Sequence, residues 1–231
     1  MIIIVFWLLL PYVLFIFYRY NKYKKSSYRA ASGNTFLETV NNKGNYGEYL
    51  TFSYLEKLKD YHKLMTNLYI PKEDGTTTEI DLIMLSETGI YVLESKNYSG
   101  WIFGDERQKY WTQTFPRGQK YRFFNPIWQN KAHIKALNTV LKLDNDSVYK
   151  SYIIFSERCT IKNVNFYSPN VKVINRDDLI KIIKKDIEES EKIFTVEEIN
   201  NLYFKLMKYT HAKDALKKDH IDNIKMKRLN R

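Results

Sequence analysis

The chain has few of the residues that build disulfides, zinc sites or nucleotide-binding loops. Cys159 is the one cysteine among 231 residues, so an intrachain disulfide is excluded and a reducing compartment suits the folded part. It follows the apolar stretch 151–155, which predicts a buried structural thiol. His62, His211 and His220 are scattered without metal-ligand spacing. The sequence has no phosphate-cradling glycine loop, so ATP-driven chemistry has no support.

Acidic residues are also in deficit. The chain has 37 Lys and Arg against 26 Asp and Glu, a net charge of +11. That excess favours a negatively charged partner, either nucleic acid or an anionic membrane surface, and does not choose between them. A solvated lysine-rich surface is the alternative. The length permits one α/β domain with extra helices, or two small domains, and a 44% hydrophobic content is ample for a core.

The first twenty residues are almost free of charge. Residues 2–18 read IIIVFWLLLPYVLFIFY, near the lower length limit for a membrane span. Tyr20 extends the segment into the interface, and Pro11 would kink a helix without forbidding it. We expect one transmembrane helix over 1–20 and a basic juxtamembrane linker over 21–42.

A basic cluster without acids follows this segment: Arg19, Lys22, Lys24, Lys25 and Arg29. By the positive-inside rule it predicts a single-pass protein of the cell membrane, with the N-terminus outside and the C-terminal domain cytoplasmic. A cleaved signal peptide would need basic residues before the apolar run and small residues at a cleavage site, and neither is present. A buried core helix disagrees with a segment that is apolar on every face.

The remaining pattern predicts alternating helices and strands after a weakly structured lead-in over 28–40. Two strands, 79–85 and 90–96, form a hairpin joined by the four-residue loop 86–89. Asn125 and Pro126 predict the start of a helix that runs to about Leu143. The other expected elements are helices over 44–58, 179–185 and from 195 onward, and strands over 63–70, 101–103, 110–113, 149–155 and 171–174. The order indicates an α/β or α+β fold with a mixed sheet.

The hairpin brings charged residues together. If its strands pair across the loop, Asp81 lies opposite Glu94 and Glu79 lies opposite Lys96. Opposite residues in an antiparallel pair share a face, as do residues two apart along one strand. Asp81, Glu94 and Lys96 therefore cluster on one face of the sheet.

Two carboxylates on one face repel each other unless a positive charge separates them. A hard divalent cation such as Mg²⁺ takes one or two carboxylates and keeps several waters. Lys96 beside the ion could steady a hydroxide or the charge developing on a phosphate, which suits phosphodiester hydrolysis. The alternative is an ordinary cross-strand ion pair, because Glu and Lys are both abundant in this chain.

Several short motifs, in this order and spacing, resemble the NERD (nuclease-related) domain, a family placed in the PD-(D/E)xK superfamily. They are Gly44–Glu48 (GNYGE), Glu79–Asp81 (EID), Gly89–Lys96 (GIYVLESK), Asn125–Pro126, Gln129 and His133. The resemblance covers about 43–143, with weaker agreement to 183. It implies a restriction-endonuclease-like mixed sheet flanked by helices. We place the nuclease-like domain at 43–190 and a helical basic tail at 191–231.

The resemblance also implies roles. Asp81 and Glu94 would bind Mg²⁺ or Mn²⁺, the Ser95 carbonyl would be a further ligand, and Lys96 would be the catalytic lysine. Every essential position of the family pattern is filled.

Three helix residues have an implied role and an alternative. Glu48 matches a glutamate that assists the metal site in many superfamily members, and Gln129 matches a polar residue on the helix after the core sheet. Each could instead be a solvent-facing helix residue. His133, one turn after Gln129, is favoured as an ordinary packed or exposed helix histidine.

Residues 101–128 interleave aromatic and basic side chains, an arrangement that could stack bases and hold phosphates, or could be core and surface of a strand and loop. The basic C-terminal tail suits nucleic acid or the inner leaflet. The leading hypothesis is a membrane-anchored, divalent-metal-dependent nuclease acting on DNA in preference to RNA. The alternative is a non-catalytic module that binds nucleic acid or protein at the inner face of the membrane.

Overall fold

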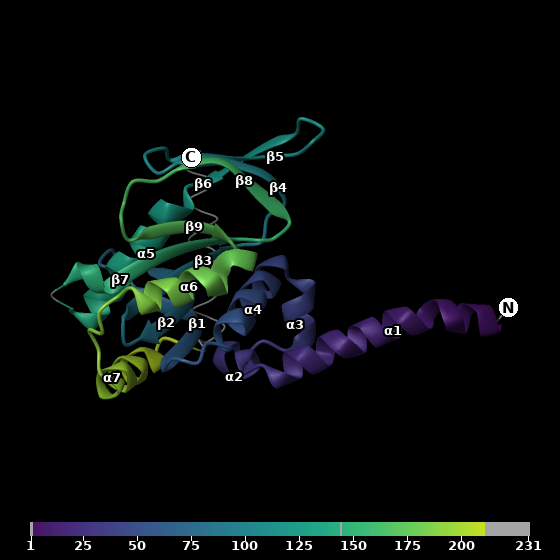
Figure 1. Cartoon of the computed structure of the whole chain (residues 1–231), viewed down its shortest axis with the longest axis horizontal. Coiled ribbons are helices and arrows are strands. Elements are labelled where there is room, and N and C mark those ends of the chain that lie inside the picture. Colours follow the sequence, from purple (N-terminus) through teal and green to yellow (C-terminus); the bar gives the residue numbers. More distant parts are fainter. Residues whose placement is uncertain (1, 144, 211–231) are drawn as a thin grey trace.

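The computed structural model describes the backbone of residues 2–143 and 145–210, and the side chains of residues 9–143 and 145–210. Its centre is a five-stranded mixed sheet of order β1-β2-β3-β7-β9 (Figure 1). The strands are β1 (His62–Pro71), β2 (Thr77–Ser86), β3 (Gly89–Lys96), β7 (Tyr149–Phe155) and β9 (Val171–Asn175). The first three are antiparallel, whereas β3, β7 and β9 run parallel, so the predicted mixed α/β sheet is confirmed.

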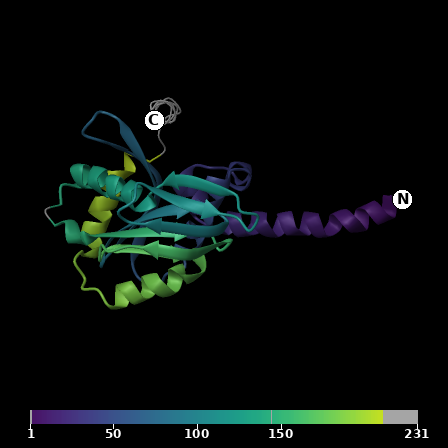
Figure 2. The same ribbon diagram turned by 90° about the horizontal axis from the view of Figure 1, so that it is seen from above.

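Helices cover both faces of this sheet, as seen from above in Figure 2. On one face α5 (Pro126–Leu141) and α7 (Val196–Met207) pack over a core that includes Leu137 and Leu206. On the other face α4 (Lys43–Leu55) and α6 (Leu179–Glu188) pack over a second core that includes Phe52 and Ile183. Residues 90–93 of β3 are buried on both faces, which explains their unbroken apolar run.

A second sheet of four strands, order β6-β5-β4-β8, stands above the first at one end. It comprises β4 (Gly100–Asp105), β5 (Tyr110–Thr114), β6 (Lys120–Phe124) and β8 (Cys159–Asn165). The sequence predicted β4 and β5 but not β6 and β8. The strand β6 (KYRFF) lies within an aromatic and basic segment and β8 (CTIKNVN) has few apolar residues, so neither stands out as an apolar run. Trp111 stacks on Phe155 of β7 and joins the two sheets, and Cys159 is buried as predicted.

The predicted register of the β2–β3 hairpin is confirmed, but its loop is shorter than expected. Ser86 pairs with Gly89, which leaves a two-residue turn in place of the predicted four-residue loop. Gly89 has φ +141°, and a Cβ there would lie 2.8 Å from the Val148 carbonyl oxygen. The glycine at position 89 therefore allows the β2–β3 ladder to include one more residue pair than the turn-like composition of residues 86–89 indicated.

The N-terminus of α5 forms as the sequence predicts. The Asn125 side chain accepts hydrogen bonds from the backbone N–H groups of Ile127 and Trp128, with Pro126 at the first helical position. The helix ends at Leu141, two residues before the expected end. Two short 3₁₀ turns, Asp146–Val148 and Arg176–Asp178, precede β7 and α6.

The segment expected to be a weakly structured lead-in is helical. It forms α2 (Tyr28–Ser32) and α3 (Phe36–Asn41), and α3 begins with a capping box between Thr35 and Glu38. The prediction was wrong because the ring of Tyr28 is fully buried against Tyr49 and Phe52 of α4. This aromatic contact fixes a segment whose polar composition gave no such signal.

The N-terminal residues form one long helix, α1 (Ile2–Lys25), which projects from the domain (Figure 1). Tyr23, near its end, is buried beside Phe36 and Tyr49, while Leu9, Leu14 and other apolar side chains further out are exposed. Within the part of the chain whose side chains are described, no helix has both the length and the apolar character needed to cross a membrane. Residues 2–8 of the predicted span and 211–231 of the predicted basic tail lie outside that part.

Candidate active site

The candidate site lies where β2 and β3 separate. Their ladder ends at the Leu82–Leu93 pair, so the expected pairs Asp81–Glu94 and Glu79–Lys96 do not form as ladder pairs. Glu79 pairs instead with Tyr69 of β1, whose hydroxyl donates a 2.7 Å hydrogen bond to Glu79 Oε1. The separation of the two strands opens a gap at Asp81.

An unusual backbone conformation in β1 accompanies this gap. Asn67 has φ +56°, a left-handed conformation that asparagine tolerates better than most residues, and it lies at the register position opposite Asp81. Ile80 and Ile83 both belong to the core beneath α5 and α7, although strict alternation would place them on opposite faces. The side chains of β2 therefore switch from one face of the sheet to the other at Asp81, which strict alternation could not predict.

The Asp81 side chain spans the gap between the two strands. Its Oδ2 accepts a 3.0 Å hydrogen bond from the backbone N–H of Ser95 on β3. The Ser95 hydroxyl lies 3.4 Å from that of Thr51 on α4. Asp81 thus lies within the plane of the sheet, bonded to the strand that carries Glu94 and Lys96.

Lys96 connects β3 to α5. Its Nζ donates to Glu94 Oε1 at 2.5 Å and to Gln129 Oε1 at 3.0 Å. The Gln129 amide therefore faces Lys96 from the helix and is not a purely solvent-facing amide.

His133 contacts the other oxygen of Glu94. Its Nε2 lies 3.1 Å from Glu94 Oε2, and its Nδ1 lies 2.8 Å from the hydroxyl of Thr78 on β2. The histidine is packed, as favoured from the sequence, yet it touches the candidate site directly. Thr78 had no sequence signal, because only the tertiary structure brings it to α5.

Glu48 reaches the same region from α4, on the opposite face of the sheet. Its Oε2 is inaccessible to solvent and accepts no hydrogen bond from any residue that the structure describes. Burial, reinforced by the charges of Glu79 and Glu94, raises the pKa of Glu48 to about 8. The alternative of a solvent-facing helix glutamate is therefore wrong.

Three carboxylates thus converge, and we call Glu48, Asp81 and Glu94 the carboxylate cluster. Burial and the charges of Glu94 and Glu48 raise the pKa of Asp81 well above its ordinary value. Burial opposes ionisation of Glu94 too, but Lys96 and His133 outweigh it and hold the pKa of Glu94 at about 2. Glu94 and Asp81 outweigh the burial of Lys96 and raise its pKa. The pKa values of Glu48 and Asp81 are raised although Lys96 pairs with Glu94, so the cluster suits an additional positive charge.

The oxygen donors of the site match what a hard divalent cation requires. Within the described residues, no three His, Cys, Asp or Glu side chains are arranged so that they could hold a metal ion by themselves. Mg²⁺, however, takes one or two carboxylates, adds carbonyl oxygens and keeps waters. Asp81 and Glu94, with the buried, unpartnered oxygen of Glu48 beside them, fit such an ion. The metal-binding and catalytic roles of these residues, and of Ser95, stay predictions.

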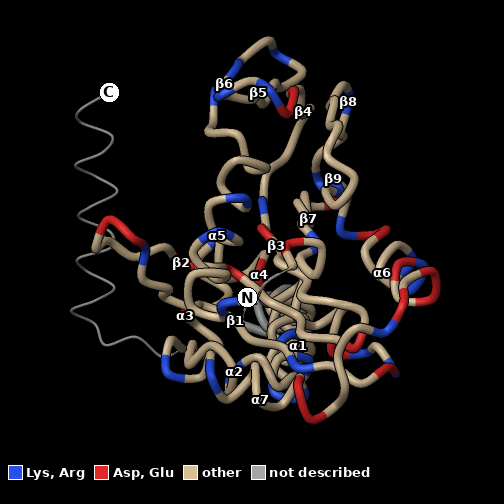
Figure 3. Tube along the Cα trace, turned by 90° about the vertical axis from the view of Figure 1, so that its left-hand side faces the viewer, with Lys and Arg blue, Asp and Glu red and all other residues tan. Residues whose placement is uncertain are grey.

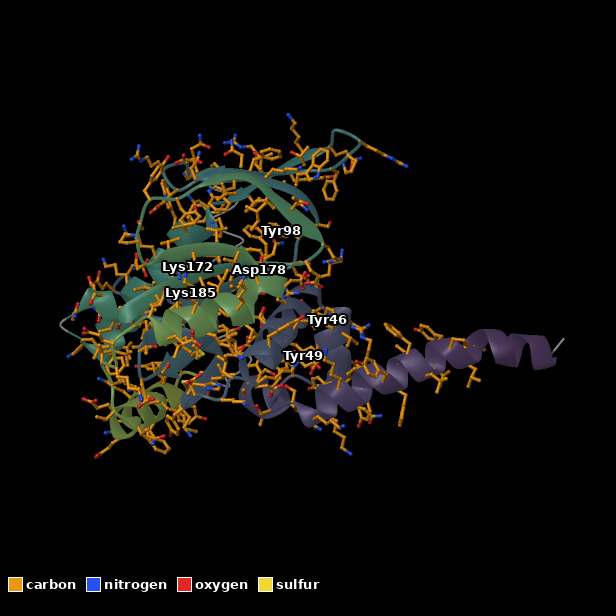
Figure 4. The ribbon with its side chains drawn as sticks, viewed as in Figure 1. Tyr46, Tyr49, Tyr98, Lys172, Asp178 and Lys185 are labelled. Carbon is orange, nitrogen blue, oxygen red and sulfur yellow. The ribbon has the colours of Figure 1, made fainter. Side chains whose placement is uncertain are left out.

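Lys96 and Gln129 also lie at the wall of a cavity of about 570 Å³. We call this cavity the aromatic pocket; its other lining residues are Tyr98, Tyr110, Arg122, Phe123 and Phe124. Tyr98, labelled in Figure 4, lies between the two sheets, where its ring contacts Phe123 and Phe155. The pocket therefore joins the interleaved aromatic and basic segment of the sequence to the candidate site.

Comparison with known proteins agrees with this geometry. The model of the nuclease-related domain (NERD) family matches residues 43–156, the segment that carries α4, the β2–β3 hairpin and α5. The chain is also 34% identical over 181 residues to the uncharacterized protein pXO1-01 of Bacillus anthracis, covering 78% of this chain and 82% of that one. No solved structure matches. The chain therefore belongs to the nuclease-related domain family, with a fold consistent with the restriction-endonuclease-like superfamily.

Proposed function

We propose that this protein is a divalent-metal-dependent nuclease that hydrolyses phosphodiester bonds in DNA. The observation that carries the proposal is the meeting of the carboxylate cluster with Lys96 where β2 and β3 separate. Membership of a nuclease-related family supports the reaction class. The net charge of +11 suits a polyanionic substrate.

Asp81 and Glu94 would hold the metal, Mg²⁺ or Mn²⁺, with the Ser95 carbonyl as a further ligand. A metal bound there would polarise a phosphoryl oxygen and lower the pKa of a coordinated water. Asp81 is already oriented by the Ser95 N–H, so its free oxygen is the one available for the ion. The unpartnered Oε2 of Glu48 would accept a hydrogen bond from a coordinated water.

Lys96 would stabilise the charge that develops on the phosphate and steady the attacking hydroxide. Gln129 would position the lysine, because its amide oxygen accepts a hydrogen bond from Lys96 Nζ. His133 would hold Glu94 in place through Oε2, which leaves Oε1 toward the lysine. In this arrangement α5 orients the residues that β3 supplies.

The experiment that tests the proposal is cleavage of single-stranded DNA, duplex DNA and RNA in Mg²⁺, in Mn²⁺ and in EDTA. The expected result is metal-dependent cleavage that falls by roughly 100-fold or more in Lys96→Ala. Lys135→Ala is the matched control, because Lys135 is an exposed lysine on α5 that pairs with Glu73 outside the site. Intact DNA in both metals, with binding retained by Lys96→Ala, would favour the non-catalytic binding module instead.

We further propose that α1 tethers the domain to the inner face of the cell membrane, with the N-terminus outside. Exposed apolar side chains such as Leu14 and Phe17 on α1, followed by basic residues, support this placement. Tyr46 and Tyr49 lie where α1 reaches α4 (Figure 4), and Arg19 stacks on Tyr46. The test is membrane fractionation of the full chain beside a chain lacking residues 1–18. Recovery of both in the soluble fraction, or of both in the membrane after alkaline washing, would contradict the tether.

A further inference from the structure

The aromatic pocket has a composition that neither an ordinary core nor a metal site requires. It is bounded by Lys96 and Gln129 on one side and by aromatic rings on the other. The rings come from two places: Tyr98 lies two residues beyond the end of β3, whereas Tyr110 and Phe124 are paired residues of β5 and β6. Its volume of about 570 Å³ lies within the range of about 300–1,000 Å³ typical of ligand sites.

The rings at the mouth of the pocket are only partly buried. Tyr110 and Phe123 are half-buried, and β6 is the edge strand of its sheet. Trp111, which lies next to Tyr110 on β5 and does not line the pocket, is by contrast fully buried and stacked on Phe155. The pocket therefore presents partly exposed aromatic surface to a ligand, whereas Trp111 belongs to the core.

A cation is built into the aromatic wall. The Arg122 guanidinium lies 4.9 Å from the centre of the Tyr110 ring and is exposed. Figure 3 shows Lys and Arg along β6 and the β5–β6 turn, at the outer edge of the molecule. Aromatic faces beside guanidinium groups are the surfaces on which unpaired bases stack while the backbone is held electrostatically.

We propose that the aromatic pocket holds an unpaired nucleobase next to the phosphodiester attacked at Lys96. The proposal rests on the proposed function and names its substrate class: DNA that is single-stranded, or has an unpaired base, at the point of cleavage. Lys96 lies at both the pocket and the carboxylate cluster, so a base in the pocket places its own phosphate near the lysine. A base inside a duplex cannot enter such a pocket without leaving the stack.

The test measures binding without catalysis. The full chain, purified in detergent, is titrated into a fluorescein-labelled single strand and into its fully paired duplex, in EDTA, with fluorescence anisotropy as the readout. We expect tighter binding of the single strand, and a loss of about 10-fold in that affinity in Tyr110→Leu and in Phe124→Leu. Duplex affinity should be unchanged. Two variants are used because either ring could be needed for folding, which thermal melting checks.

Tyr121→Leu is the matched control. Tyr121 is an exposed ring, 55% accessible, on the same strand, but it does not line the pocket. An equal loss in Tyr121→Leu, or no single-strand preference in the wild-type chain, would overturn the pocket as a base site. Cleavage of duplex and single strands at equal rates would overturn this inference while leaving the nuclease intact. Absence of both binding and cleavage would instead overturn the proposed function.

Discussion

The two sheets of this protein differ in how they are covered. The five-stranded sheet is buried on both faces by helices, and its charged residues contact one another beneath them. The four-stranded sheet has one buried face, which includes Ile102 and Trp111, while Trp101 and Phe103 on its other face are 38% and 37% accessible. One sheet supplies a rigid, charged site, and the other supplies aromatic and basic contact surface.

Because of this difference, substitutions in the five-stranded sheet should affect stability, and substitutions in the four-stranded sheet should affect ligand binding. A buried charge network is sensitive to every change, because an unpaired buried charge is costly. Partly exposed aromatic groups contribute little to folding but much to contacts with a ligand. Substitutions in the two sheets should therefore differ in kind as well as in size.

The largest loss of stability is expected from Glu94→Ala. It leaves Lys96 and His133 without their shared carboxylate, and breaking a buried pair typically costs 3–5 kcal/mol. We expect about 3 kcal/mol in the free energy of unfolding, because repulsion on Asp81 and Glu48 is relieved at the same time. Urea denaturation measures the effect. The exposed pair Lys135–Glu73 is the comparison: Lys135→Ala should cost less than about 1 kcal/mol.

Gly104→Ala tests how the second sheet is attached. A Cβ at residue 104 would lie 2.2 Å from the Trp111 ring, so the indole must shift away from Phe155. Such overpacking should cost about 1–3 kcal/mol in the free energy of unfolding. Combined with Trp111→Leu, which vacates the space, the glycine substitution should lose most of its effect. Additive losses in the double variant would show that the clash is not the cause.

The pH dependence of stability tests the carboxylate cluster. The pKa of Glu48 is raised from an ordinary 4.5 to about 8, so folding favours its protonated form. That contribution is fully present below pH 4.5 and is lost as the pH rises through about 8. In EDTA, the wild-type chain should therefore lose stability across this window, and Glu48→Gln should lose less. Glu73→Gln, an exposed carboxyl, should leave the profile unchanged. Identical profiles for wild type and Glu48→Gln would refute the assignment.

The smallest effect is expected on the open face of the second sheet. Phe103→Ser removes a partly exposed ring and should change the free energy of unfolding by no more than about 0.5 kcal/mol. Thermal unfolding of Phe103→Ser is compared with that of Gly104→Ala, whose substitution lies one residue away on the same strand. A loss larger than that of Gly104→Ala would mean that the exposed face is structural, and the contrast between the sheets would fail.

Much of the fold was predictable because its signals are local. The β2–β3 register followed from two apolar runs joined by a short turn, and the start of α5 followed from Asn125 and Pro126. The strands β6 and β8 were missed because they are fixed by pairing with other strands, and the helices α2 and α3 were missed because the burial of Tyr28 overrides their polar composition. Asp81, Glu94 and Lys96 came from the hairpin pattern, and Gln129 and Glu48 came from the family resemblance. The structure brings these five residues to one place.

The sequence by itself determined which charged groups are available, the hairpin that carries three of them, and the excess of positive charge. The tertiary structure alone decided three features of the site. Asn67 adopts a left-handed conformation in β1 opposite Asp81, Glu48 brings a buried oxygen without a partner among the described residues, and β6 brings an aromatic pocket to Lys96. The physical reason is the separation along the chain of the residues that interact. Turns, caps and alternation depend on neighbours along the chain, whereas burial and electrostatic repulsion depend on which distant segments the packed core brings together.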